Sequence, residues 1–255
     1  LNKGGNFLAD DGSRFPQEEK LPHSAGAWAT DVDNDGDIDL LVRKYQNVSG
    51  RYWTSLYLNE KSQSGQTKWT DASLSNMTPW RGEDAAYMDV GDLNGDGLPD
   101  VYVVKTNHQD WLLINHGFID GKAAIDANRV PKGSFENNTF IGLPHDVAES
   151  SAADAGDIDG DGDIDIVIGN LAEGGVSVWI NDSAGNFFEQ GKIRVPDVNC
   201  GAAELRLVDL NKDGDLDIIM ACNYDWGGGT IGAITAKSGS GGLRQLVNDG
   251  KGFFT

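Results

Sequence analysis

Residues 157–165 read Asp157-Ile-Asp-Gly-Asp-Gly-Asp-Ile-Asp165, and three other stretches of the chain follow the same D-x-[DN]-x-D-G-x-x-D pattern. These stretches are Asp31-Val-Asp-Asn-Asp-Gly-Asp-Ile-Asp39, Asp92-Leu-Asn-Gly-Asp-Gly-Leu-Pro-Asp100 and Asp209-Leu-Asn-Lys-Asp-Gly-Asp-Leu-Asp217. The four nonapeptides start 61, 65 and 52 residues apart, a period typical of one small sheet per repeat with loops of variable length. The chain is therefore organised as four repeats.

Each nonapeptide lies between two segments that read as strands. The segments that follow it are apolar and mostly β-branched, like strands buried on both faces: 40–42, 101–104, 166–168 and 218–220. The segments that precede it are rich in small residues, which suit the crowded innermost strand around a propeller axis: 25–29, 85–87, 150–153 and 202–203. We therefore expect each nonapeptide to join two strands of one sheet.

An asparagine recurs out of phase with the nonapeptide. It follows an apolar or aromatic run and usually precedes a Gly-containing turn and an aromatic residue, at Asn2, Asn59, Asn115, Asn181 and Asn248. Such segments are typical of the hairpin between two outer strands. The two markers together predict an all-β fold: a β-propeller of four-stranded antiparallel blades, with four repeats present.

We expect one propeller domain with blade repeats at residues 18–75, 76–142, 143–196 and 197–255, preceded at 1–17 by the end of another blade or a closing strand. The chain opens and closes at nearly the same phase of the repeat, which favours a part of a longer array. Further blades or a partner chain would then cover the open sheet faces. Closure at four blades, with residues 1–10 completing the last one, is the alternative.

The composition excludes several classes of protein. The 255 residues include 34 glycines and 7 prolines, and no apolar stretch approaches the length of a membrane helix, so we expect no membrane insertion. A formal net charge of -20 argues against nucleic acid as a partner. So large an acidic excess also strains a compact fold, unless bound cations neutralise part of it.

The nonapeptides offer the ligands that calcium prefers. Positions 1, 3, 5 and 9 carry Asp or Asn, and the Gly at position 6 allows the turn that folds these oxygens around one centre. The residue type at position 7 varies, as expected of a ligand that contributes its backbone carbonyl. Ordinary metal-free turns are the alternative, but the crowding of carboxylates in all four loops favours about four calcium ions, one per loop.

The predicted side-chain ligands are Asp31, Asp33, Asp35, Asp39, Asp92, Asn94, Asp96, Asp100, Asp157, Asp159, Asp161, Asp165, Asp209, Asn211, Asp213 and Asp217. The predicted carbonyl ligands are Asp37, Leu98, Asp163 and Asp215. A helix-loop-helix calcium site would need Glu at position 12, where this chain has Val42, Val103, Ile168 and Met220. The Asp at position 9 would instead close each site.

At these nonapeptides the chain resembles the FG-GAP and VCBS repeat family, which includes the calcium-binding blades of integrin α-subunits and of some fungal propeller lectins. The resemblance extends over essentially the whole chain. It implies a calcium-stabilised propeller, commonly a seven-bladed ring, in a secreted or cell-surface protein. The Phe-Gly and Gly-Ala-Pro signatures of the integrin version are not evident, which argues against an integrin role.

Residues outside the loops offer weaker indications. Trp80, Tyr224 and Trp226 are aromatic residues in polar loops, suited either to stacking on sugar rings or to anchoring those loops. His23 and His145 each follow Leu-Pro before an inner strand, as a conceivable catalytic or metal-binding pair or as a repeated loop feature.

The two cysteines, Cys200 and Cys222, bracket the fourth nonapeptide almost symmetrically. This placement favours a disulfide between adjacent strands. Two buried free thiols are the alternative.

The sequence favours an extracellular, calcium-stabilised recognition module that binds glycan or protein ligands. No nucleophile, phosphate-binding glycine loop or redox motif stands out, which argues against an enzyme. One alternative is the propeller portion of a secreted carbohydrate-active enzyme, such as a polysaccharide lyase or sugar dehydratase. Another is an architectural domain of an adhesin or surface filament.

Overall fold

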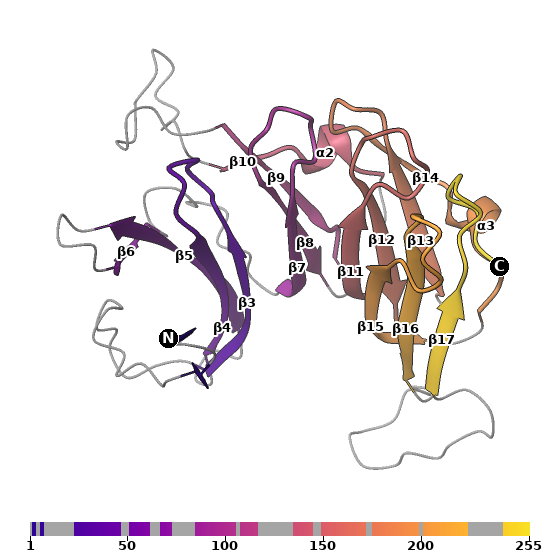
Figure 1. Cartoon of the computed structure of the whole chain (residues 1–255), viewed down its shortest axis with the longest axis horizontal. Helices are drawn as coiled ribbons and strands as arrows, with labels where there is room; N and C mark the ends of the chain where they lie inside the picture. Colours follow the sequence, from indigo (N-terminus) through magenta and orange to yellow (C-terminus); the bar gives the residue numbers. More distant parts are fainter. Residues whose placement is uncertain are drawn as a thin grey trace. The chain divides into compact units, whose positions relative to one another are not determined.

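The computed structural model describes residues 2–3, 6–7, 23–46, 51–61, 67–72, 85–105, 108–116, 135–144, 149–171, 175–198, 201–223 and 242–255. The chain forms two compact units, residues 1–83 with 117–134 and residues 84–116 with 135–255. Figure 1 labels strands β3 to β17 and helices α2 and α3.

The first unit contains a short hairpin and one four-stranded sheet. The hairpin pairs β1 (Asn2–Lys3) with β2 (Asn6–Phe7), and the sheet is an antiparallel meander in the order β3-β4-β5-β6. The strands of the sheet are β3 (His23–Thr30), β4 (Asp39–Gln46), β5 (Arg51–Lys61) and β6 (Thr67–Asp71). The nonapeptide at 31–39 connects β3 to β4.

The second unit contains three further antiparallel meanders. The first has β7 (Ala85–Gly91), β8 (Asp100–Lys105), β9 (Trp111–Asn115) and β10 (Phe135–Asn137). The next has β11 (Ser150–Gly156), β12 (Asp165–Asn170), β13 (Val176–Asn181) and β14 (Phe187–Glu189). The last has β15 (Gly201–Val208), β16 (Asp217–Asn223) and β17 (Gly242–Leu246), and a bridge between Asn248 and Phe254 closes its outer hairpin.

The observed strands confirm the predicted all-β class and the meander topology of propeller blades. The second unit also contains two single-turn helices, α2 (Thr139–Gly142) and α3 (Gly191–Arg194). None of the helices in the described part of the chain has the length and apolar character needed to cross a membrane. The number of blades in a complete ring and the predicted blade boundaries stay predictions.

The three sheets of the second unit pack face to face, and apolar side chains fill the two layers between them. Strand β12 supplies both layers, because successive residues of a strand point to opposite faces. Ile166 and Ile168 pack toward β8 of the preceding sheet, where the ring of Trp179 meets Tyr102 edge-on at 5.9 Å. Val167 packs into the other layer with residues of the last sheet. The apolar runs 101–104 and 166–168 are therefore buried on both faces, whereas Leu40, Val42 and Ile219 in the runs after the first and fourth nonapeptides are half-buried.

Polar contacts join the inner strands of these three sheets. Asp89 of β7 shares a hydrogen bond with Asp154 of β11, and Asp154 Oδ2 accepts the backbone N–H of Leu207 in β15 at 2.7 Å. Burial, and secondarily the neighbouring Asp154, raise the pKa of Asp89 to about 7. The positive charge of Arg206 in β15 attracts the carboxylate of Asp154. The Arg206 guanidinium carbon lies 5.3 Å from the centroid of the Tyr87 ring. The inner strands are therefore linked by an acidic pair that is most favourable with one proton bound.

The raised pKa of Asp89 predicts a pH-dependent stability. The folded chain keeps a proton that the unfolded chain releases near the ordinary pKa of 3.8. The proton held by Asp89 therefore adds its full contribution to the free energy of unfolding below pH 3.8. That contribution is lost as the pH rises through about 7. In Asp89→Asn the amide donates to Asp154 at every pH. We expect the free energy of unfolding of the unmodified chain, relative to Asp89→Asn, to fall between about pH 4.5 and about pH 7.5.

Urea denaturation of both proteins in a chelating buffer measures this difference. The chelator keeps calcium from contributing to either curve. A difference that stays constant across the pH range would show that Asp89 does not titrate in this way.

Candidate metal centres

The first residue of each nonapeptide folds the loop around its own carboxylate. Its Oδ2 atom accepts the backbone N–H of the Gly at position 6, at 2.9 Å in the first loop and 2.8 Å in the second. The corresponding distances in the third and fourth loops are 3.1 and 3.2 Å. Positions 4 and 6 both have positive φ, from 57° at Asn34 to 100° at Gly214. Gly at position 6 is therefore needed for the turn, while Asn or Lys is tolerated at position 4.

The last residue of each nonapeptide is a buried aspartate that joins the loop to the outer hairpin. Asp39, Asp100, Asp165 and Asp217 are at most 1% exposed. In Asp165, Oδ2 accepts the N–H of Ile158 in its own loop at 3.1 Å, and Oδ1 accepts the N–H of Asn181 at 2.9 Å. The other three loops repeat both hydrogen bonds.

Burial makes ionisation of three of these aspartates, Asp39, Asp100 and Asp165, unfavourable. It raises the pKa of Asp39 to about 6 and the pKa values of Asp100 and Asp165 to about 7 each. Neighbouring acids of the same loop raise them further, while the backbone N–H donors lower them. A cation placed beside such a carboxylate would favour its charged form.

Two of the four loops bring three carboxylates around one point. In the first loop, oxygens of Asp31, Asp33 and Asp35 lie within 4.8 Å of one another, and in the third loop those of Asp157, Asp159 and Asp165 do so. Asp33 Oδ1 and Asp159 Oδ1 are buried and have no hydrogen-bond partner among the described residues. Unpartnered buried carboxylate oxygens in a set of hard ligands fit a calcium ion.

The second and fourth loops differ because position 3 is an asparagine. Asn94 Nδ2 donates to Asp96 Oδ2 at 3.1 Å, and Asn211 Nδ2 donates to Asp213 Oδ2 at 2.6 Å. The amide thus occupies a carboxylate oxygen that the all-aspartate loops leave available. At positions 1, 3, 5 and 9 these two loops carry three carboxylates, against four in the first and third loops, and would hold a cation with fewer charged ligands.

In the second unit, the recurring asparagine ties the second and third loops to the next sheet. Asn181 Nδ2 donates to Ile164 O in its own sheet and to Leu93 O in the loop of the preceding sheet, both at 2.9 Å. Asn248 Nδ2 repeats this with Leu216 O at 3.0 Å and Ile158 O at 2.8 Å. The amide oxygens accept turn N–H groups of the same hairpins. The sequence marked these asparagines as hairpin residues; the structure shows that they also connect neighbouring sheets.

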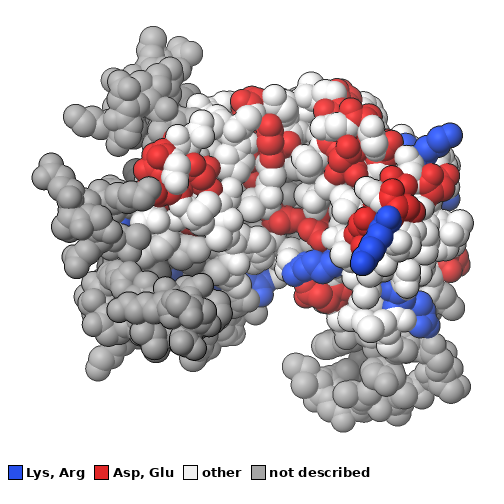
Figure 2. All heavy atoms as spheres, viewed as in Figure 1, with Lys and Arg blue, Asp and Glu red and all other residues white. Residues whose placement is uncertain are grey.

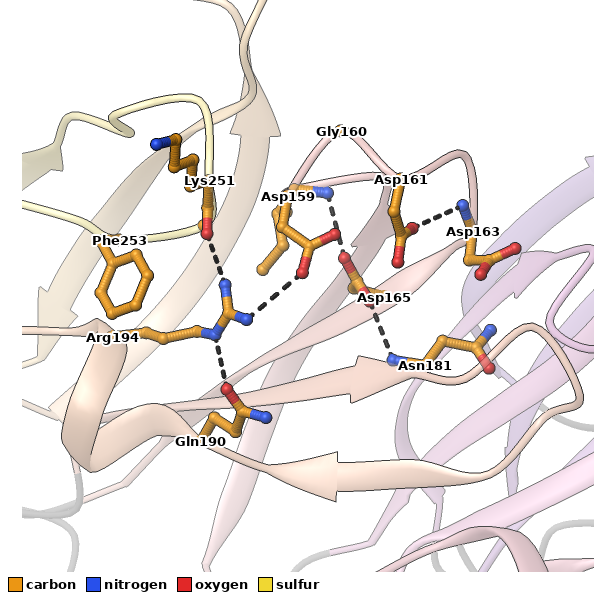
Figure 3. Close-up of polar contacts among 12 residues, drawn as sticks. Asp159, Gly160, Asp161, Asp163, Asp165, Asn181, Gln190, Arg194, Lys251 and Phe253 are labelled. Atoms are coloured by element: carbon orange, nitrogen blue, oxygen red, sulfur yellow. Dashed lines mark hydrogen bonds and ion pairs between the residues drawn. The ribbon is translucent and has the colours of Figure 1, made fainter.

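An arginine that the sequence did not single out also reaches the third loop. Arg194 of α3 forms an ion pair with Asp159, Nη2 to Oδ2 at 3.3 Å, as drawn in Figure 3. The only sequence signal was a basic residue at the end of the segment that links two repeats.

Several predicted residues lie outside the described ranges. Trp80, Tyr224, Trp226, His145 and Cys200 are among them, and of His23 only the backbone in β3 is described. Cys222 is disulfide-bonded in the structure, and Cys200 is the other cysteine of the sequence. The aromatic ligand residues, the histidine pair and the Cys200–Cys222 pairing stay predictions. So do the carbonyl ligands at position 7, where Asp163 instead shows a side-chain contact with the Ser183 hydroxyl.

The charge distribution agrees with the sequence pattern. In Figure 2 the acidic side chains gather in separate clusters on the face shown, and basic side chains are fewer. Among the described residues, the two carboxylate triads belong to the nonapeptides. The excess negative charge is thus concentrated at points where cations would reduce repulsion.

No curated protein sequence matches the chain. Among solved structures it is similar, at 17% identity and a TM-score of 0.45, to an Agrocybe aegerita lectin that specifically recognises non-reducing terminal N-acetylglucosamine. That similarity covers 90% of this chain and 64% of the lectin chain, so this chain spans less than two thirds of the lectin's length.

The family comparison is specific to the segments that contain the nonapeptides. Residues 31–103, 92–168 and 157–220 each match the FG-GAP-like repeat. Each matched stretch begins at the first Asp of one nonapeptide and ends in the strand after the next. The chain therefore belongs to the family of proteins with FG-GAP-like repeats.

Proposed function

We propose that this chain is part of an extracellular β-propeller recognition module that calcium stabilises and that binds glycan or protein ligands. The observation that carries the calcium part is the pair of buried, unpartnered oxygens, Asp33 Oδ1 and Asp159 Oδ1, each inside a carboxylate triad. A buried charged atom without a partner is costly, and a cation among its neighbours removes that cost.

All four nonapeptides would hold one ion each, through side-chain oxygens at positions 1, 3, 5 and 9 and the backbone carbonyl at position 7. The ions would have a structural role, because the loops connect the sheets. The position-9 aspartate binds the outer hairpin of its own sheet, and in the second and third loops the carbonyl at position 2 accepts the next sheet's asparagine. Ordering a loop therefore also orders the contact with its neighbour.

An extracellular location follows from the kind of site proposed. Short oxygen-ligand loops of extracellular modules fill at calcium concentrations of about 10⁻⁴ to 10⁻³ M, which the cytosol does not supply. The net charge of -20 would leave a metal-free chain under strong self-repulsion. Both arguments favour a calcium-rich compartment.

Further blades of the same type would complete the ring. Within the second unit, Ile164 packs over Gly91 and Leu216 packs over Gly156, so the residue at position 8 covers the residue just before the preceding nonapeptide. Two residues at these positions of the repeat are exposed: Ile38, at position 8 of the first nonapeptide, is 53% exposed, and Val208, just before the fourth nonapeptide, is 38% exposed. Leu210, whose counterparts Leu93 and Ile158 accept the asparagine bonds, is 37% exposed. These exposed apolar side chains are suited to pack against a further blade of the same type.

The recognition part of the proposal rests on composition and on the general behaviour of propellers, whose loops carry ligand sites. Trp80, Tyr224 and Trp226 are the candidate contact residues. Their aromatic rings suit the apolar faces of sugars, and the polar loops around them suit the hydroxyl groups.

Calcium should raise the melting temperature of the metal-free protein. At a calcium concentration of 100 times Kd, one site adds about 2.7 kcal/mol, or roughly 5–10 °C for a domain of this size. Asp157→Ala removes a ligand of the third loop and should reduce this increment. Glu149→Gln removes an exposed charge outside the loops and should leave it unchanged.

Differential scanning fluorimetry in millimolar calcium, in magnesium and in chelator gives these increments. Equal melting temperatures in calcium and chelator would contradict the calcium part of the proposal. Equal increments in calcium and magnesium would assign the effect to general charge screening.

A glycan array probed in calcium tests recognition. We expect binding to one class of sugar, weakened by roughly tenfold in Trp80→Ala or Trp226→Ala, since one aromatic stacking contact contributes about that factor. Phe188→Ala, which removes an exposed aromatic ring elsewhere, is the control and should bind normally. If the calcium-loaded protein binds no glycan, the ligand is not a sugar and the protein-ligand form of the proposal alone survives.

A further inference from the structure

Arg194 links the third loop to the outer hairpin of the last sheet. Its Nη2 atom pairs with Asp159 Oδ2 at 3.3 Å, and its Nη1 atom donates to the backbone carbonyl of Lys251 at 2.6 Å. Its Nε atom donates to Gln190 Oε1 at 2.8 Å, which fixes the plane of the guanidinium. The guanidinium carbon lies 5.0 Å from the centre of the Phe253 ring. Figure 3 shows these groups converging on the arginine between the loop and the hairpin.

The ion pair is largely shielded from water. The side chains of Arg194 and Asp159 are 11% and 16% exposed, so the pair is screened less than a surface salt bridge. The backbone carbonyl of Arg194 also accepts the N–H of Phe254 at 2.7 Å. Arg194 therefore contacts the candidate metal ligand Asp159 through its side chain. It contacts the hairpin at residues 248–254 through both its side chain and its backbone.

The first loop provides a matched comparison inside the same chain. Both loops have aspartates at positions 1, 3, 5 and 9, and both leave Oδ1 of the position-3 aspartate buried without a partner. The charges that act on Asp33 are the acidic Asp35 and Asp31, whereas Asp159 also has a cation beside it. Among the described residues, the two loops thus offer the same side-chain ligands and differ in one neighbouring positive charge.

We infer that Arg194 is a built-in counter-ion of the third loop, which lowers that loop's calcium affinity and keeps the terminal hairpin docked when calcium is absent. The inference rests on the calcium binding proposed above. It goes further by assigning different affinities to two loops with identical side-chain ligands, and by naming the residue responsible.

Electrostatics gives the direction of the effect. Without calcium, the guanidinium neutralises part of the charge of Asp159 and stabilises the empty loop. When calcium binds Asp159, the carboxylate has less charge to offer the arginine, and the two cations repel each other across it. The ion pair is therefore stronger in the metal-free loop than in the loaded loop. By linkage, an interaction that favours the metal-free state weakens calcium binding.

If Arg194 had a purely structural role, its removal would change the calcium affinity in the opposite direction. If Arg194 only held the Asp159 carboxylate in place for the ion, its removal would disorder the ligand and lower calcium affinity. The change of affinity in a variant without the charge distinguishes these roles, because the two accounts predict opposite signs.

The test follows calcium binding at each loop by NMR of protein labelled with ¹⁵N-glycine. The amides of Gly36 and Gly162, which bond to the position-1 carboxylates, report the first and third loops. In Arg194→Gln we expect the Gly162 transition to move to a calcium concentration roughly threefold to tenfold lower, the range for a partly buried ion pair. The Gly36 transition should not move. Lys192→Gln removes an exposed charge from the same helix and should change neither transition.

The hairpin supplies a second readout. In chelator, the Phe254 amide should exchange faster with solvent in Arg194→Gln than in the unmodified chain, and calcium should restore its protection. If Arg194→Gln does not fold, Arg194→Lys replaces it: a lysine forms a looser pair, so its third loop should still bind calcium more tightly than the unmodified loop.

The outcomes separate this inference from the proposed function. If neither glycine responds to calcium, the calcium proposal itself fails. If both respond but the Gly162 transition stays in place or moves to higher calcium in Arg194→Gln, or in Arg194→Lys where that variant is used, calcium binding stands and the counter-ion role is wrong.

Discussion

The buried aspartate that ends each nonapeptide is the interaction on which the rest of the structure depends. Its two oxygens accept one N–H from its own loop and one from the outer hairpin, so it joins the inner and outer halves of every sheet. It is at most 1% exposed, which makes its charge costly without a cation nearby. The fold therefore places its least hydrated carboxylates beside the loops best suited to bind calcium.

The asparagine hydrogen bonds and the arginine ion pair extend this arrangement from one sheet to the next. The second and third loops each present a backbone carbonyl to the next hairpin, and the third loop adds a carboxylate for Arg194. Apolar side chains such as Trp179 and Leu205 fill the layers between the sheets of the second unit, and the polar contacts join the same sheets. A change of charge in a loop thus acts on the contact between two sheets as well as on one turn.

The sequence was sufficient for the fold class and for the position of the loops, because both follow local periodicities. It did not predict the contacts between sheets: Asn181 bonds to Leu93 across 88 positions of the chain, and no local pattern specifies such a partner. Arg194 was missed for the same reason, since its significance depends on Asp159, 35 positions away. The acidic pair of Asp89 and Asp154 also required the stacking of sheets to be known.

We propose that the four loops bind calcium and that this binding holds the sheets together. Equilibrium dialysis of the metal-free protein against radioactive calcium counts the bound ions directly. The account predicts about four ions per chain at millimolar calcium, with the all-aspartate first loop filling among the first. Binding of no ion at that concentration would contradict it.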